Sequence, residues 1–278
     1  MKPSLEVLIC TCNDRILKVK EVLLEPRPDI TYLVSHQIFP DGRPQSTEII
    51  CAELQRRSDV RIVATESKGL SKNRNNAIKH AQGKYILIAD DDINLVAESL
   101  SKVIEFFDLG ENVECCTFRI ETPSGSPYKE YKRSPGFHNR ISILSVSSIE
   151  LVFRLSTIRR EDVHFDERFG LGTSYPCSEE AIFLSDLLQR KIRVFRSSVV
   201  IVVHDSESSG QQFGSVDACR ARGAFFHRAF GWYGYPLLLA HVCRKYPKFR
   251  DSMSFSNYLI TSTKEFFQFG RSSNDTLI

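Results

Sequence analysis

The stretch that most constrains the fold of this chain is an apolar run, Tyr85 to Ala89, which leads directly into three aspartates, Asp90 to Asp92. The run is short, rich in residues that favour strands and bounded by polar residues, so it predicts a buried strand. Neighbouring carboxylates repel one another unless a cation lies between them or water surrounds them. The sequence therefore predicts a strand that ends in either a metal site or a solvated acidic turn.

Strand-like and helix-like segments alternate through about the first ninety residues. The strand-like segments are Leu5–Cys10, Thr31–Ser35, Val60–Thr65 and Tyr85–Ala89, and the helix-like segments are Arg15–Leu24, Gln45–Gln55 and Ser71–Ala81. This alternation predicts an α/β fold with a mainly parallel central sheet flanked by helices. Ligands bind outside the carboxyl ends of such strands, so the three aspartates lie at the expected ligand edge.

The rest of the chain is less regular. We expect helices at Val96–Asp108 and Glu179–Arg190, strands at Val113–Ile120, Ile149–Phe153 and Val194–Val203, and a mobile polar loop at Glu121–Pro135. The last sixty or so residues have a helical pattern. We therefore expect one α/β domain over residues 1–214 and a C-terminal helical extension over residues 215–278 that packs on it.

The composition excludes several classes of function. The 37 basic and 34 acidic residues leave a net charge of +3, which is too small for a protein that grips nucleic acid. The eight cysteines lack the paired spacing of zinc sites and favour reduced core thiols. The N-terminus does not resemble a signal peptide, and no apolar run reaches the ~18 residues of a membrane span. We expect a cytoplasmic protein with no nucleic-acid partner.

A divalent cation is the ligand that the acidic cluster favours. Asp90 and Asp92 point to the same side of an extended chain, because successive side chains alternate. Carboxylate oxygens suit Mg or Mn. His204 ends the last strand where a polar loop begins, and it is either a further ligand or a satisfied core histidine. The pattern predicts a metal site made of Asp92, Asp90 and His204.

Arg74 falls on the apolar face of the helix-like segment Ser71–Ala81, together with Leu70 and Ala77. An arginine that is turned toward the protein needs an anion. Either a ligand phosphate or the aspartate cluster can provide it, so the alternatives are a ligand contact and a purely structural ion pair.

A glycine-containing loop that starts at Phe165 ends at Ser178, a candidate helix N-cap, and is followed by Glu179 and Glu180. Acidic residues in a first turn also complement the helix dipole. Glu180 begins a stripe that continues through Phe183 and Leu187, so the periodicity predicts that Glu180 faces the packed side and Glu179 does not. A carboxylate held beside apolar groups can act as a general base.

Several of these segments together resemble family 2 glycosyltransferases of the GT-A fold, over about residues 4 to 210. The segments are the turn Thr11–Asp14, GLSKNRNNAI from Gly69, the three aspartates, FDERFGLG from Phe165, the glutamate pair and the strand that ends at His204. The resemblance implies that the aspartates hold a divalent cation, Mn or Mg, which binds the diphosphate of a nucleotide sugar. It implies a catalytic base in the glutamate pair, for which we select Glu180 over Glu179.

The resemblance also implies a nucleotide pocket at the strand ends. Its expected residues are Thr11, Asn13, Arg15, Gln37, Lys68, Gly69, Arg74, Asp90 and Asp91. The family commonly has an aspartate that reads the nucleobase after the second strand, where this chain has His36 and Gln37. We expect Gln37 or His36 to substitute for it.

The function that the resemblance implies is metal-dependent, inverting transfer of a sugar from a nucleotide-diphosphate donor, a UDP-sugar, to a hydroxyl. The implied acceptor is a glycan or a lipid-linked acceptor in cell-surface polysaccharide synthesis, such as lipopolysaccharide or capsule. Two alternatives stay open. One is a sugar-1-phosphate nucleotidyltransferase, although the first turn lacks the glycine-rich loop of that class, and the other is a non-catalytic nucleotide-sugar-binding subunit.

Basic and aromatic residues are interleaved in the C-terminal segment. Arg220, Arg222 and Arg228 alternate with aromatic residues up to Trp232 and Tyr233. This pattern favours either peripheral contact with anionic lipid at the inner face of the cytoplasmic membrane or a helical cap packed on the sheet.

Overall fold

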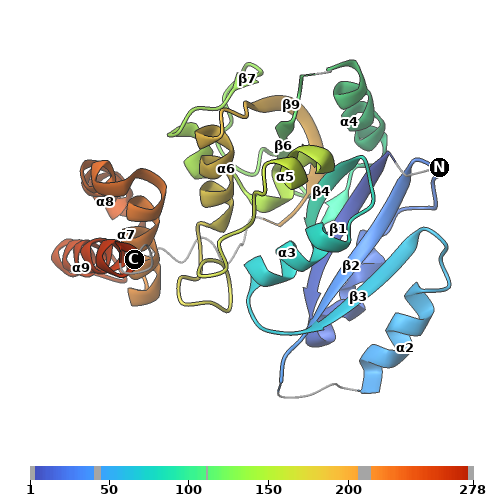
Figure 1. Cartoon of the computed structure of the whole chain (residues 1–278), viewed down its shortest axis with the longest axis horizontal. Helices are drawn as coiled ribbons and strands as arrows, with labels where there is room; N and C mark the ends of the chain where they lie inside the picture. Colours follow the sequence, from blue (N-terminus) through green and yellow to red (C-terminus); the bar gives the residue numbers. More distant parts are fainter. Residues whose placement is uncertain (1–3, 41–44, 111, 206–213, 275–278) are drawn as a thin grey trace.

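The computed structural model of the chain describes residues 4–40, 45–110, 112–205 and 214–274. In this part of the chain nine strands form one mixed sheet in the order β3-β2-β1-β4-β8-β6-β9-β5, with β7 beside β9 (Figure 1). The strands are β1 (Leu5–Cys12), β2 (Ile30–Ile38), β3 (Val60–Glu66), β4 (Tyr85–Asp90), β5 (Asn94–Leu95), β6 (Cys115–Glu121), β7 (Gly136–Phe137), β8 (Leu151–Arg154) and β9 (Val194–Val203). The expected α/β fold with a largely parallel central sheet is confirmed.

The parallel strands β3, β2, β1 and β4 bring their carboxyl ends to one edge. Cys10 of β1 pairs with Ser35 of β2 on one side and with Asp90 of β4 on the other. Side chains that alternate along β1 enter two separate cores, with Val7 and Ile9 in one and Leu8 and Cys10 in the other. Burial on both faces explains why these strands are continuously apolar in the sequence.

The other half of the sheet is mixed. β8 is antiparallel to both β4 and β6, while β6 and β9 run parallel to each other. The short strands β5 and β7, which the sequence did not reveal, pair antiparallel with β9. His204 therefore follows β9 at the same edge of the sheet as the end of β4.

The helices are α1 (Val19–Val22), α2 (Gln45–Leu54), α3 (Leu70–His80), α4 (Ala97–Leu109), α5 (Leu155–Arg160), α6 (Glu179–Gln189), α7 (Val216–Phe230), α8 (Gly234–Phe249) and α9 (Phe255–Asn274). One expected helix is wrong: Arg15–Leu24 is a 3-10 helix, Asn13–Lys18, followed by the single turn of α1. Ile16 of the 3-10 helix and Val19 and Val22 of α1 are the buried residues of this segment.

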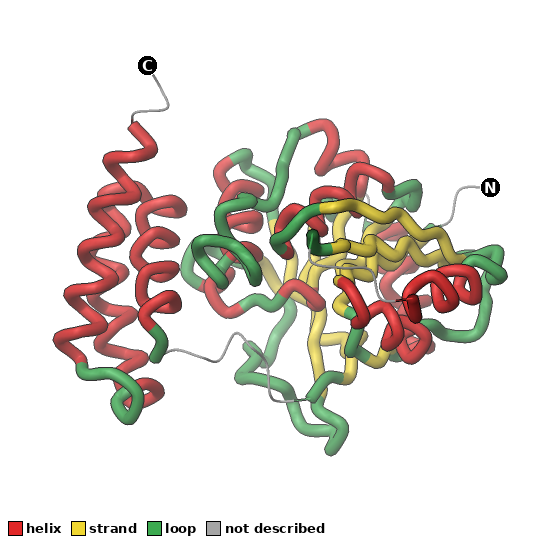
Figure 2. Tube along the Cα trace, turned by 90° about the horizontal axis from the view of Figure 1, so that it is seen from below, coloured by secondary structure: helices red, strands yellow, loops and turns green. Residues whose placement is uncertain are grey.

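The helices α7, α8 and α9 lie together at one end of the molecule, next to α6 (Figures 1 and 2). Their apolar residues, including Phe225 and Phe226, form a third core that also contains Phe169 and Ile182 from the neighbouring loop and α6. Trp232 and Tyr233 are exposed. Most of the aromatic residues in this segment are therefore packing residues, and none of the described helices has the length and apolar character of a membrane span.

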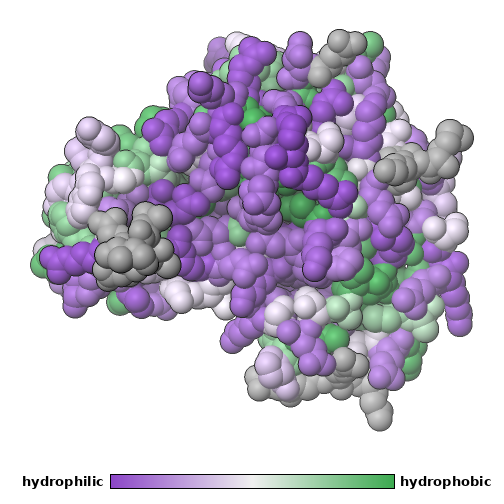
Figure 3. Space-filling model, viewed as in Figure 1, coloured by the Kyte–Doolittle hydropathy of each residue, from purple (hydrophilic) through white to green (hydrophobic). Residues whose placement is uncertain are grey.

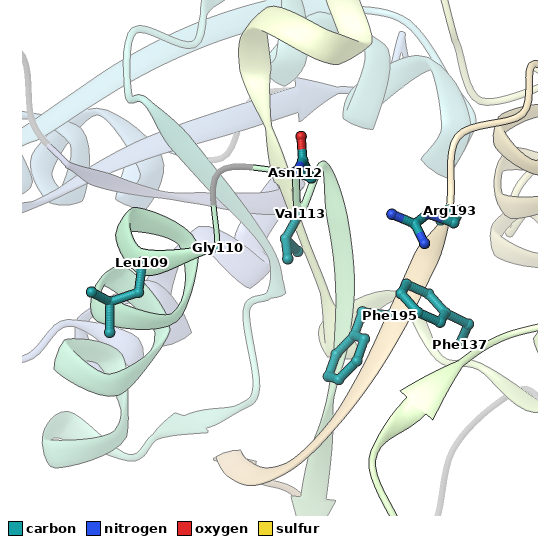
Figure 4. A pocket seen from close by; sticks show the side chains of 7 residues that line it. All are labelled: Leu109, Gly110, Asn112, Val113, Phe137, Arg193 and Phe195. Atoms are coloured by element: carbon teal, nitrogen blue, oxygen red, sulfur yellow. The ribbon is translucent and has the colours of Figure 1, made fainter.

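The surface does not by itself mark a binding site. The face in Figure 3 is mainly hydrophilic over the middle of the molecule, with apolar side chains in separate patches. A hollow of about 370 Å³ lies between the end of α4, β7 and the start of β9, where Arg193 lies over the Phe137 ring beside Phe195 (Figure 4). It opens near the amino ends of β6 and β9, at the opposite sheet edge from Asp90.

Candidate active site

The loop after β4 anchors its central aspartate. Asp91 is buried, and its carboxylate accepts hydrogen bonds from the Thr11 hydroxyl at 2.6 Å and from Arg15 Nε at 3.1 Å. Arg15 Nη2 also contacts Asp91 and lies 2.8 Å from Asp92 Oδ2. Thr11 and Asp91, which we expected in the nucleotide pocket, therefore support the loop from beneath, whereas Arg15 remains half exposed above it.

Asp92 is more exposed than its neighbours and faces His204. Its Oδ1 lies 3.5 Å from His204 Nε2, while His204 Nδ1 donates to the Asp205 carbonyl at 2.7 Å. The hydrogen bond with His204, followed by that with Arg15, lowers the pKa of Asp92 well below its ordinary value. The Tyr128 ring packs edge-on against His204 at 5.9 Å, from the loop after β6.

The donor set of Asp92 and His204 fits a divalent cation. With Nδ1 held by a carbonyl, the lone pair of neutral His204 is on Nε2, the nitrogen that faces Asp92. The predicted three-ligand set does not form, however: no group of three potential ligands occurs within the described residues. Asp90 turns instead toward Arg74. Mg-type cations are commonly held by one or two carboxylates together with water and substrate phosphates, so two protein ligands suffice.

Arg74 joins the two acidic clusters. Its side chain is 1% exposed, and Nη1 donates to Glu179 Oε1 at 2.8 Å while Nη2 lies 3.4 Å from Asp90 Oδ1 and 2.7 Å from the Ser148 hydroxyl. Acceptors of the protein occupy Nη1 and Nη2, which fits the structural ion pair that the sequence left open, and a contact between Arg74 and the donor stays a prediction. Its position beneath the site holds the end of β4 next to the start of α6.

The glutamate pair is arranged in the opposite way to the periodic prediction. Glu179 is buried against Arg74, whereas Glu180 keeps part of its surface exposed. The error has a clear cause: α6 is covered on two sides, by Phe183 and Leu187 against the sheet and by Ile182 against the C-terminal helices. A single apolar stripe cannot assign the burial of first-turn residues in a helix packed on both sides.

Glu180 has the electrostatic environment of a proton acceptor. Removal of water by the surrounding protein, followed by the charge of Glu179, raises the pKa of Glu180 to about 7, against the opposing effect of Arg74. A carboxyl group with this pKa changes protonation near neutral pH. Glu180 was the residue that we selected as base, although the burial argument for it was wrong.

The junction before α6 also differs from the expectation. Ser178 does not cap the helix with its side chain; its hydroxyl accepts a hydrogen bond from Arg222 Nη1 at 2.6 Å. Its backbone is left-handed, with φ of 80°, an uncommon conformation for a residue with a side chain. Sequence reasoning missed this link and that of Ser148, because each partner lies far away in the chain and lacks a local pattern.

The expected nucleobase readers, Gln37 and His36, are buried near the end of β2. Gln37 is buried and donates to the Ser67 hydroxyl at 2.8 Å and to the Gly69 carbonyl at 3.1 Å. His36 is also buried, with Nε2 3.0 Å from the Asn13 carbonyl. Both side chains thus contact neighbouring strand ends, and the expectation that one of them reads the base stays a prediction.

The remaining pocket residues divide between surface and support. Lys68 is exposed and lies over the Phe39 ring, while Asn13 accepts a hydrogen bond from the Phe39 amide at 2.9 Å. Gly69 has φ of +119°, and a Cβ there would lie 3.0 Å from Thr173 Cγ2. Glycine is thus required where this turn meets the loop before α6.

Comparison with known proteins identifies the family. The family described as Glycosyl transferase family 2 matches residues 8–166, which include the end of β1, the aspartate cluster and Arg74. The chain belongs to glycosyltransferase family 2. The aspartate cluster is thus part of a family 2 domain, and the fold is that of its GT-A relatives.

One curated protein resembles part of this chain in sequence, and solved structures resemble it in fold. Part of the chain is 37% identical over 75 residues to the minor teichoic acid biosynthesis protein GgaB of Bacillus subtilis (strain 168), a match that spans 26% of this chain and only 8% of that protein. Crystallised S. aureus TarS 1-349 in complex with UDP-GlcNAc superimposes with a TM-score of 0.67 at 16% identity, covering 100% of this chain and 84% of that one. The mannosyltransferase PcManGT from Pyrobaculum calidifontis, in complex with GDP-Man and Mn2+, gives a TM-score of 0.60 at 13% identity over 96% and 88% of the two chains.

Proposed function

We propose that the protein is an inverting glycosyltransferase that moves a sugar from a nucleotide-diphosphate donor to an acceptor hydroxyl. The observation that carries the proposal is the ion-pair bridge through Arg74, which contacts Asp90 at 3.4 Å and Glu179 at 2.8 Å. This bridge brings the diphosphate-binding edge and the candidate base into one site. The UDP-GlcNAc and GDP-Man complexes of the structural relatives support a nucleotide-sugar donor, and we propose a UDP-sugar.

Glu180 takes the proton in the proposed reaction. As it removes the proton from the acceptor hydroxyl, that oxygen forms a bond to the anomeric carbon, and the bond from this carbon to the diphosphate oxygen breaks. The nucleotide diphosphate leaves with the bonding electrons, and a single displacement inverts the anomeric centre. Glu179, held by Arg74, positions the first turn of α6 and does not exchange the proton.

Asp92 and His204 would hold a divalent cation, Mn or Mg, beside the donor. When bound there, the cation offsets the negative charge of the diphosphate. Arg15 and Lys68 are the described basic side chains of the predicted pocket that remain exposed, and they add positive charge at the same edge. Asp91 and Thr11 keep the loop in place.

For the acceptor, we propose a cell-surface glycan or a lipid-linked precursor. The likeness of a 75-residue segment to a teichoic acid biosynthesis protein supports this class. Peripheral contact with an anionic membrane surface on the cytoplasmic side is part of the proposal, and it now rests on the exposed Trp232 and Tyr233, because Arg220 and Arg228 are engaged in ion pairs.

The test is incubation with a panel of nucleotide sugars, with Mn or with a chelator, and measurement of the released nucleotide diphosphate. We expect release from one donor, dependent on the metal, and an inverted anomeric configuration in the product by NMR. Glu180→Gln is the matched control, since it should bind the donor without release. Pyrophosphate formation from a sugar 1-phosphate and a nucleoside triphosphate would instead indicate a nucleotidyltransferase, and binding without any turnover in the wild type would indicate a non-catalytic subunit.

A further inference from the structure

Ser178 connects the glycine-containing loop to α6 and carries a backbone geometry that needs support. Its φ of 80° and ψ of 9° place it in the left-handed region, where the side chain of an L-residue is crowded. Its hydroxyl makes no capping bond to α6. The hydroxyl accepts from Arg222 Nη1 at 2.6 Å and lies 3.7 Å from Cys177 Sγ. The Ser178 hydroxyl, which could have capped α6, is therefore bonded to Arg222 of α7 instead.

The two residues after Ser178 are the glutamate pair, and they are held differently. Glu179 is fixed by its ion pair with the buried Arg74. The Glu180 side chain has a hydrogen bond to its own backbone N–H, and no hydrogen bond or ion pair to another residue is found for it within the described part of the chain. The direction of the Glu180 side chain thus depends on the backbone of the first turn, which begins at Ser178.

We infer that Arg222 is a positioning residue for Glu180: by holding Ser178 in its left-handed conformation, it aims the proposed base from the C-terminal helices. The inference rests on the proposed function. It gives α7 a role beyond packing, because Arg222 acts at the first turn of α6. Arg228 contacts Asp186 further along the same helix at 3.0 and 2.8 Å.

Kinetics of Arg222→Met test the inference. A displaced base costs turnover and leaves donor binding intact, so we expect kcat to fall by about 10- to 100-fold while the donor Kd stays unchanged. Arg222→Lys, which keeps an N–H donor, should recover part of the loss. The matched control is Arg220→Met, on the same helix, which breaks an ion pair to Glu265 within the C-terminal helices and should lower the Tm without changing kcat.

A second variant separates positioning from mere stability. Glycine adopts left-handed geometry without crowding, so Ser178→Gly should make Arg222 less necessary. We expect Arg222→Met to reduce kcat several-fold less in the Ser178→Gly background than in the wild type. An equal loss in both backgrounds, or an Arg222→Met enzyme with the kcat of Arg220→Met, overturns the inference.

Amide hydrogen exchange makes the inference testable apart from activity. In the ligand-free protein, Arg222→Met should speed exchange across residues 177–184, and Arg220→Met should not. Unchanged exchange there contradicts the inference even if the wild type transfers sugar. If Arg222→Met exchanges faster but the wild type transfers no sugar, Arg222 does support the first turn of α6, and only the proposed function is contradicted.

Discussion

Asp92 and Glu180 are carboxylates at one site, yet their surroundings shift their pKa values in opposite directions. Asp92 lies between His204 and Arg15, and these partners hold its pKa far below the ordinary value. Glu180 lies where protein has displaced water beside another glutamate, which raises its pKa to about 7. Each stands next to an acid that an arginine anchors, Asp91 beside Arg15 and Glu179 beside Arg74.

The opposite pKa shifts of Asp92 and Glu180 indicate different chemical roles for the two carboxyl groups. A carboxylate with a low pKa stays ionised at all physiological pH values and suits the binding of a cation, whereas one near 7 can take up and release a proton. The anchored neighbours supply the geometry in both clusters. The predictions below either sharpen this division or break it.

The largest effect is expected from Glu180→Gln. The change keeps the size of the side chain and removes its ability to accept a proton, so turnover should fall by roughly 100- to 10,000-fold. Donor binding, measured by calorimetry, should be retained. Because the folded protein raises the pKa of Glu180, the ionised form destabilises the fold, and the variant should be at least as stable as the wild type at pH 8. Near-full turnover in Glu180→Gln with none in Glu179→Gln would show that the roles of the pair are reversed.

Arg74→Met should affect stability most. It leaves Glu179 and Asp90 without their buried counterion, and loss of one partner of a buried pair costs about 3–5 kcal/mol. Arg15→Met should cost only about 1 kcal/mol, since the Arg15 side chain is 46% exposed and solvent screens its ion pairs. Urea unfolding of both variants measures the difference. Equal losses of unfolding free energy in the two variants would contradict the distinction between the buried ion pairs of Arg74 and the solvent-exposed ion pairs of Arg15.

Asp92→Asn should weaken the metal-dependent part of donor binding. We expect at least about a tenfold loss of affinity for the nucleotide diphosphate in the presence of Mn, equivalent to about 1.4 kcal/mol, with partial recovery at high Mn. Calorimetry with Mn and with a chelator gives the two affinities. The cation assignment fails if the wild type binds the nucleotide equally well in the chelator.

The pH dependence of kcat should show a single acidic limb. Below its pKa of about 7, Glu180 is protonated and cannot accept the acceptor proton, so kcat should fall about tenfold for each pH unit and level off above pH 8. Glu179 and Asp90 raise this pKa and Arg74 lowers it. The limb should be absent from the residual rate of Glu180→Gln. Its persistence there would assign the ionisation to another group.

The smallest effect is expected at the C-terminal helices. Replacing the exposed Trp232 and Tyr233 together by serine should reduce flotation with anionic liposomes a few-fold, with no change in activity on a soluble acceptor. The control is the same assay with neutral liposomes. If the wild type does not float with any lipid mixture, the exposed aromatic pair has no membrane role.

Local sequence patterns alone were enough to predict the strands and the sheet edge that carry the aspartate cluster. The apolar run of β4 required a buried strand, and its alternation with helical segments required a parallel sheet whose carboxyl edge carries Asp90 to Asp92. These features depend on residues close together in the sequence, so they can be predicted from it. The helix expected over Arg15–Leu24 was wrong, since the chain forms a 3-10 helix over Asn13–Lys18 before the single turn of α1.

Tertiary structure decided which member of each acidic cluster is anchored and which is available. Arg74 of α3 selects Glu179 and Asp90, and Arg222 of α7 takes the hydroxyl of Ser178. These partners are distant along the chain, and periodicity describes only one helix relative to one packed face. The sequence by itself therefore predicted an aspartate cluster at the end of β4 and a glutamate pair at the start of α6. Only the tertiary structure placed His204 and Arg15 beside Asp92 and buried Glu180 beside Glu179, and a carboxyl pKa depends on the groups around it.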